Sequence, residues 1–167
     1  MRLHFRITRA LLDSVRIDLR RPHPFAHERV GFISAGLSAA DEDVLIVARE
    51  YRAVLDEDYL RDPTVGAMMG AEAIRKALQW AMQDRLALFH VHTHGGQGLP
   101  GFSRIDLREN AKFVPDFLKV TPQCAHGAIV LSDNAARGQL GFDPRQPCMP
   151  IDSFAEIGAP IRKWRAA

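Results

Sequence analysis

Residues 90–106 read His90-Val-His92-Thr-His94-Gly-Gly-Gln-Gly-Leu-Pro-Gly-Phe-Ser103-Arg-Ile-Asp106. The apolar residues that lead into the histidines are typical of a buried strand, and the four glycines and one proline that follow favour tight turns. Ser-x-x-Asp is a capping-box pattern that opens a helix. The stretch therefore predicts a strand, a loop and a helix in direct succession, which is an arrangement of α/β folds.

The histidine spacing predicts a metal site at the end of this strand. Side chains at positions i and i+2 of a strand share one face, with Cα atoms about 6.6 Å apart, so His92 and His94 can reach one ion together. His90 shares the face but lies about 13 Å from His94, so a site with all three would need a bent strand. Asp106 is the nearest carboxylate that the loop returns to the histidines. Two His, one Asp and a water form an open zinc site of the catalytic type.

Each part of this pattern also has a purely structural explanation. His-x-His occurs at exposed strand ends without a metal, and Ser103 with Asp106 can serve only to cap a helix. The two roles are compatible, because a helix that starts at Ser103 holds Asp106 in its first turn, oriented towards the preceding strand.

Strand and helix patterns alternate through the rest of the chain. The predicted strands are Leu3–Ile7, Val30–Ala35, Val44–Ala48, Leu86–His94, Gly127–Ser132 and Gln139–Phe142, and the predicted helices contain Leu11–Leu19, Ala71–Asp84 and the residues from Ser103 through Phe117. Val44–Ala48 is an unbroken apolar run, which predicts a strand buried on both faces. Asp56–Gly70 is polar and glycine-containing, which favours a mobile surface segment that contacts a partner. Met149–Ala167 fits no clear pattern.

Composition restricts the class of protein. The 167 residues include 47% hydrophobic and 25% charged residues, as in a globular domain and unlike a disordered chain. A net charge of +2 gives no basic surface of the kind that binds nucleic acid or a membrane. Cys124 and Cys148 are expected to be reduced packing residues. With no export signal and no apolar run of about 18 residues, we expect a cytoplasmic protein.

Five residues, in order, resemble the motif of the JAMM metalloproteases, also called MPN-plus domains. That family is marked by a Glu, then His-x-His, then Ser-x-x-Asp, which Glu28, His92, His94, Ser103 and Asp106 match. The segment Glu28-Arg-Val-Gly also matches the Glu-x-x-Gly that starts an apolar strand in the family. The resemblance covers about residues 3–142. It implies one JAMM/MPN domain over residues 1–167, an α/β fold of three layers in which helices flank a mixed, curled sheet as in cytidine deaminases.

The resemblance also implies roles for these residues. His92, His94 and Asp106 would bind one Zn²⁺, Glu28 would be the general base, and Ser103 would donate a hydrogen bond to the oxyanion. The other candidate bases do not stand in the Glu-x-x-Gly context: Glu50, Glu72 and Glu109. His23, His27 and His126 have no partner spacing and are expected to be structural or exposed.

The implied activity is hydrolysis of the amide or isopeptide bond that follows the C-terminal glycine of a ubiquitin-like protein. The chain looks like the compact prokaryotic members, with a ubiquitin-like protein or its conjugate as substrate and a possible homodimer. A glycine-ended tail would then pass through a narrow space beside Gly95–Gly101. Two alternatives stay open: an amidase or peptidase acting on a small amide or a sulfur-carrier adduct, and a non-catalytic scaffold.

The chain departs from the family pattern in one loop. The family usually has Pro after the second His and seven residues before the Ser, whereas this chain has Gly95 and eight residues. A bulge in a glycine-rich loop absorbs one residue at little cost, so we expect the ligand set to survive and the loop path to change.

Overall fold

One mixed β-sheet forms the centre of the computed structural model, which describes residues 1–24, 26–62, 64–158, 160 and 162–165. Among these residues it has nine strands, in the order β11(Arg162–Arg165)-β10(Ser153–Ile157)-β1(Arg2–Thr8)-β3(Asp43–Ala53)-β2(Val30–Ala40)-β6(Ala87–Thr93)-β7(His126–Leu131)-β8(Ala136–Gly141)-β9(Met149–Pro150). β1 pairs in parallel with β10 and β3, and β6 pairs in parallel with β7. All the other neighbouring strands are antiparallel.

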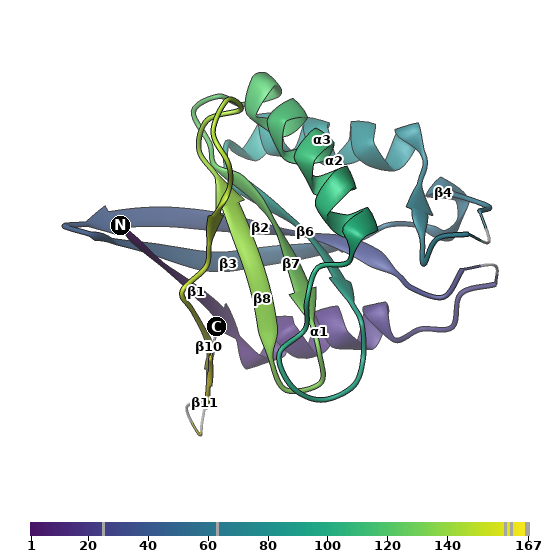
Figure 1. Ribbon diagram of the computed structural model, residues 1–167, viewed down its shortest axis with the longest axis horizontal. Coiled ribbons are helices and arrows are strands. Elements are labelled where there is room, and N and C mark those ends of the chain that lie inside the picture. The colour runs from purple at the N-terminus through teal and green to yellow at the C-terminus, as the bar shows by residue number, and fades with distance from the viewer. Residues whose placement is uncertain (25, 63, 159, 161, 166–167) are drawn as a thin grey trace.

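Helices cover both faces of this sheet. α1(Arg9–Leu19) lies against β1 and β3, whereas α2(Ala71–Asp84) and α3(Arg104–Val120) lie on the other face over β6, β7 and β8 (Figure 1). The apolar stripes of the helices explain this, because Leu12, Val15 and Leu19 are buried in one hydrophobic cluster and Trp80 and Phe117 in a second. β2 and β3 cross the direction of β8 in Figure 1, as in a curled sheet. The predicted α/β fold, with helices flanking a curled mixed sheet, is confirmed.

The expectation that Val44–Ala48 is buried on both faces is wrong. Val44, Ile46 and Ala48 are buried, but Leu45 and Val47 are 39% and 38% exposed. The reason is that α1 covers one face of β3 while α2 and α3 lie over β6, β7 and β8, which leaves the second face of this part of β3 open.

The described residues of Asp56–Gly70 contain regular secondary structure. It contains a 3-10 helix, η1(Asp56–Asp58), and the small hairpin β4(Tyr59–Leu60) and β5(Met68–Met69). Asp58 and Tyr59 are buried, and Lys76 of α2 donates to the Asp58 carboxylate at 2.7 and 3.0 Å. The segment therefore contributes to the core under α2.

The unassigned C-terminal stretch supplies strands. β9 lies at one edge of the sheet, and β10 and β11 lie at the other, where β10 pairs in parallel with β1. Cys124 and Cys148 are free, partly buried thiols, and burial raises the pKa of both. No helix within the described residues has the length and apolar character needed to cross a membrane.

Candidate metal centre

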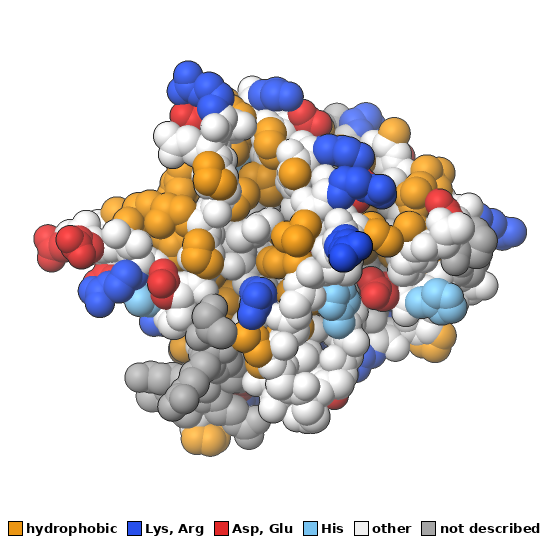
Figure 2. All heavy atoms as spheres, viewed as in Figure 1, with side chains coloured by type: hydrophobic (Ala, Val, Ile, Leu, Met, Phe, Trp, Pro, Cys, Tyr) orange, Lys and Arg blue, Asp and Glu red, His pale blue; other side chains and the backbone are white. Residues whose placement is uncertain are grey.

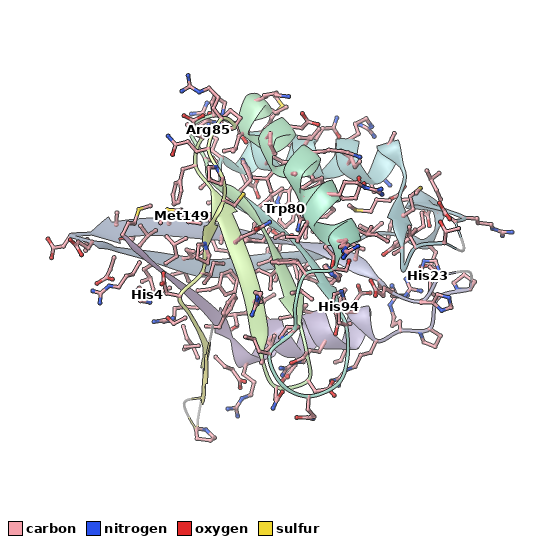
Figure 3. All side chains as sticks on the ribbon, viewed as in Figure 1. His4, His23, Trp80, Arg85, His94 and Met149 are labelled. Carbon is pink, nitrogen blue, oxygen red and sulfur yellow. The ribbon has the colours of Figure 1, made fainter. Side chains whose placement is uncertain are left out.

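His92 and His94 meet Asp106 at the end of β6. His92 lies on β6, and His94 follows it directly, at the surface below the first turn of α3 (Figure 3). The two Nε2 atoms are 3.1 Å apart. Asp106 Oδ1 lies 3.4 Å from His92 Nε2, and Asp106 Oδ2 lies 3.3 Å from His94 Nε2. The three side chains predicted to bind zinc thus converge on one point.

These distances fit a tetrahedral metal site. Zinc bonds to nitrogen and oxygen measure about 2.0 to 2.2 Å, which separates neighbouring ligand atoms of a tetrahedron by about 3.3 to 3.6 Å. Two of the three separations lie in this range, and the third is slightly shorter. Neutral imidazoles and a carboxylate are also ligands that zinc accepts. The donor set therefore suits a divalent cation and leaves a fourth position for water.

Glu28 joins the same cluster from the segment that leads into the neighbouring strand, β2. It precedes β2, whose first residue, Val30, pairs with His92. Ligand atoms of Glu28, His92 and His94 all lie within 4.8 Å of one another. Two carboxylates therefore face the histidine pair, Glu28 from the β2 side and Asp106 from α3.

Ser103 and Asp106 form a capping box at the start of α3. The Ser103 Oγ accepts a hydrogen bond from Asp106 N at 3.1 Å, and Ser103 N donates to Asp106 Oδ2 at 2.6 Å. The Ser103 side chain is exposed, and its hydroxyl hydrogen has no acceptor within the part of the chain that is described. Burial raises the pKa of the Asp106 carboxyl, but contacts from His92 and Ser103 outweigh it, so the pKa falls well below its usual value. Asp106 is therefore an oriented anion at neutral pH.

His90 stays outside the ligand cluster. Its ring packs beside His92 and Phe113, with centroids 5.4 and 5.8 Å away. Burial lowers its pKa to about 3, so the ring is neutral. The buried Nδ1 of His92 has no hydrogen-bond partner among the described residues, although metal-bound histidines usually donate this N–H to an outer acceptor.

The other histidines and carboxylates weighed from the sequence have structural surroundings. The His23 ring packs edge-on to Tyr59, and buried His126 bridges β6 to the end of α3 through Leu88 N and Thr121 Oγ1. The three rival carboxylates are all in exposed ion pairs: Glu50 with Arg52, Glu72 with Arg75, and Glu109 with Arg108 and Lys112.

Three residues that sequence reasoning missed hold the segment that carries Glu28. Gly66 O accepts hydrogen bonds from His27 N and Glu28 N at 2.9 and 3.0 Å. The guanidinium of buried Arg29 donates to Arg21 O, Pro22 O and Asp56, and the Tyr59 hydroxyl contacts both N and O of Val30. Arg29 stands inside the Glu-x-x-Gly segment and could have been singled out there, whereas Gly66 has no local signal.

The glycines of the loop after β6 have open space beside them. A Cβ added at Gly95, Gly96, Gly98 or Gly101 would meet no atom within 4 Å. The first three have positive φ angles of 65°, 70° and 90°, so backbone conformation accounts for those glycines. Ser132 Oγ donates to Gly98 O at 2.7 Å and thereby ties the loop to the turn after β7.

Comparisons with known proteins give no family for this chain. No family model and no curated protein matches it. Among solved structures, the N-terminal domain of STIL from Trichoplax adhaerens is similar at 11% identity and a TM-score of 0.38, over 80% of this chain and 40% of that one. The chain therefore spans less than half of that structure, and a likeness at this level carries no functional argument.

Proposed function

We propose that this protein is a zinc-dependent hydrolase of the JAMM type, which cleaves the amide or isopeptide bond after the C-terminal glycine of a ubiquitin-like protein. One observation carries the proposal: His92, His94 and Asp106 stand at the spacing of a tetrahedral metal site, and the carboxylate of Glu28 lies beside it. The motif order in the sequence, which resembles the JAMM family, supports the same assignment.

The residues divide into ligands and acid–base groups. His92, His94 and Asp106 would hold the ion, which when bound acidifies water and polarises the carbonyl group of the substrate. Glu28 takes the proton from the attacking water and passes it to the leaving amine. The Ser103 hydroxyl is held in place by the hydrogen bond it accepts from Asp106 N, so its own hydrogen is free to donate to the developing oxyanion.

The surroundings of the site favour a protein as the substrate. Large apolar side chains near Ser103 are exposed, with Leu99 at 38%, Ile105 at 41% and Leu107 at 50%. Lys and Arg side chains gather over the adjoining half of α3 (Figure 2). The site lies on an open surface of this kind, which suits a folded partner better than a small enclosed ligand.

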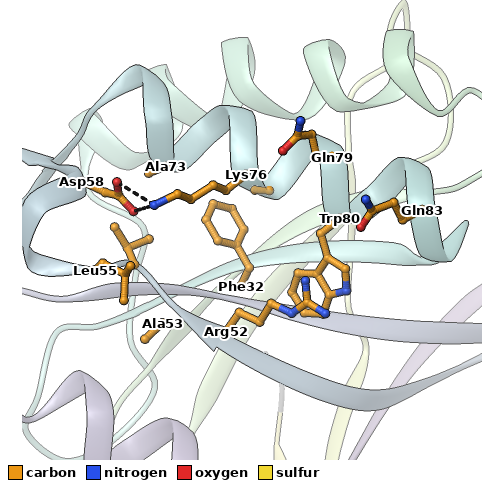
Figure 4. A pocket seen from close by; sticks show the side chains of 12 residues that line it. Phe32, Arg52, Ala53, Leu55, Asp58, Ala73, Lys76, Gln79, Trp80 and Gln83 are labelled. Carbon is orange, nitrogen blue, oxygen red and sulfur yellow. Dashed lines mark hydrogen bonds and ion pairs between the residues drawn. The ribbon is translucent and has the colours of Figure 1, made fainter.

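Cavities elsewhere in the fold are separate from this site. The cavity in Figure 4, of about 360 Å³, lies between α2 and the end of β3. Phe32 and Trp80 line it, and the Arg52 guanidinium stacks 4.0 Å from the centroid of the Trp80 ring. Neither the histidine pair nor Glu28 contributes to it.

The test separates metal binding from turnover. Glu28→Gln is expected to bind zinc as the wild type does and to lose turnover of a ubiquitin-like conjugate by about 10²- to 10⁴-fold, the usual contribution of a general base. Asp106→Ala is expected to lose zinc itself. Glu109→Gln, a carboxylate change one turn along α3, is the matched control and should retain both properties.

The outcomes discriminate between the candidate functions. Equal loss of zinc in Glu28→Gln and Asp106→Ala would contradict the separate roles. Cleavage of short peptides as fast as a folded conjugate would favour the small-amide or sulfur-carrier alternative. Wild-type protein that neither binds zinc nor cleaves any conjugate would favour a scaffold.

A further inference from the structure

We infer that Gly66 is a positioning residue for Glu28, because the missing side chain at position 66 leaves the space that the Glu28 carboxylate occupies beside His92 and His94. A Cβ built on Gly66 would lie 2.6 Å from both Cδ and Oε2 of Glu28, and 2.9 Å from Oε1. The inference deepens the proposed function and rests on it, since it takes Glu28 as the general base.

Backbone conformation does not explain the glycine. Gly66 is not among the described residues that have a positive φ, which are Asp41, Arg85, Gly95, Gly96 and Gly98. The strain that a positive φ would impose on an alanine is therefore absent at position 66. What an alanine cannot do is share the space of the Glu28 carboxylate, so close approach is the property for which glycine is needed here.

The main chain on both sides of this contact is fixed. Gly66 O accepts hydrogen bonds from His27 N and Glu28 N, so the two segments cannot separate without losing both. On the other side of Glu28, buried Arg29 is anchored to Arg21 O, Pro22 O and Asp56. The Tyr59 hydroxyl also holds Val30. The movable part of the contact is the end of the Glu28 side chain.

The size of the displacement follows from the contact distance. Two carbon atoms rest at about 3.5 Å or more, so a Cβ at 2.6 Å would push the Glu28 carboxylate away by about 1 Å. A misplacement of about 1 Å in a catalytic group can lower the rate about 100-fold. Gly66→Ala should therefore lose about 100-fold in kcat with KM nearly unchanged. Zinc content should be unchanged, because the three atoms nearest to the added Cβ all belong to Glu28 and not to His92, His94 or Asp106.

Two kinds of measurement test this. The first is a crystal structure of metal-free Gly66→Ala, in which the Glu28 carboxylate should be displaced while the main chain of residues 27–30 stays in place. The second is the kinetics of Gly66→Ala beside Gly36→Ala, a control whose Cβ would come no closer than 4.0 Å to Arg49 Cδ. In a Glu28→Ala background, Gly66→Ala should cause no further loss, because its effect acts through that carboxylate.

The inference and the proposed function can fail separately. A carboxylate that keeps its wild-type place in the Gly66→Ala structure overturns the inference, and so does a kcat equal to that of Gly36→Ala. A wild-type protein without zinc-dependent turnover overturns the proposed function, while the crystal structure still decides whether Gly66 positions Glu28. If Gly66→Ala does not fold, the double variant Glu28→Ala/Gly66→Ala should fold, because it lacks the carboxylate that the new methyl group would overlap. A double variant that also does not fold would overturn the inference.

Discussion

The helix-capping role of Ser103 can be separated by substitution from the catalytic role proposed for it. Its Oγ accepts a hydrogen bond from Asp106 N at 3.1 Å and caps α3, and its hydroxyl hydrogen is the proposed oxyanion donor. Three substitutions distinguish the roles. Ser103→Thr keeps both, Ser103→Gly removes the hydroxyl but is nearly as good a cap, and Ser103→Ala removes both.

The expected stabilities follow from the cap alone. Loss of a serine cap to alanine costs about 1 kcal/mol, which for a chain of this size lowers Tm by about 2 to 4 °C. The glycine variant should lose only a few tenths of a kcal/mol, and threonine should match the wild type, since position 103 is exposed and has room for a methyl group. Thermal unfolding of the metal-free proteins gives these values without reference to any activity.

The expected rates follow a different order. Both Ser103→Ala and Ser103→Gly lose the donor, so kcat on a ubiquitin-like conjugate should fall about 10²- to 10³-fold in each, equivalent to about 2.7 to 4 kcal/mol. The hydrogen bond to Asp106 Oδ2 comes from the main-chain N of residue 103, so it survives in all three variants and zinc affinity should change little. If Ser103→Gly keeps wild-type turnover, or if kcat simply follows Tm through the series, Ser103 is a helix cap and nothing more.

Three further predictions concern other parts of the fold. In Gly31→Ala the new methyl group would overlap the ring of Tyr51, whose hydroxyl donates to Asp18 at 2.5 Å. This variant should lose about 1 to 3 kcal/mol of unfolding free energy, measured by thermal unfolding. A stability equal to that of Gly36→Ala would contradict this packing. Burial lowers the pKa of His126 to about 4, so below pH 6.5 the unfolded chain binds more protons at this residue than the folded chain does. The free energy of unfolding, measured with denaturant, should therefore fall by roughly 3 kcal/mol between pH 6.5 and pH 4. In His126→Gln the free energy of unfolding should fall less steeply with pH. Leu60, 53% exposed on β4, is expected to contact the modifier, so Leu60→Ser should raise KM for a folded conjugate but not for a short peptide, and equal effects on both would exclude that contact.

Local sequence patterns predicted the parts of the site that local interactions build. Ser103 and Asp106 lie three residues apart and form the expected capping box, and the i, i+2 spacing of His92 and His94 brings both rings to one face of β6. Each of these features depends on residues that are neighbours along the chain, so the spacing alone contains the information.

Features that depend on distant segments could not be read from local patterns. Gly66 meets Glu28 across 38 positions, and a glycine in a polar segment gives no sign of such a contact. The burial of Val44–Ala48 was overestimated because its outer face depends on where α2 and α3 come to lie. β10 pairs with β1 from the opposite end of the chain, where its own short apolar pattern is too weak to identify it.

Zinc content, measured by elemental analysis of the purified protein with Asp106→Ala prepared in the same buffer, tests the metal centre most directly. We predict about one zinc per chain in the wild type and loss of that zinc in Asp106→Ala. The reason is that the Asp106 carboxylate, which lies 3.4 and 3.3 Å from the Nε2 atoms of His92 and His94, would be the third protein ligand. Wild-type protein that takes up no zinc even when the metal is added, or an Asp106→Ala variant that retains it fully, would contradict the account.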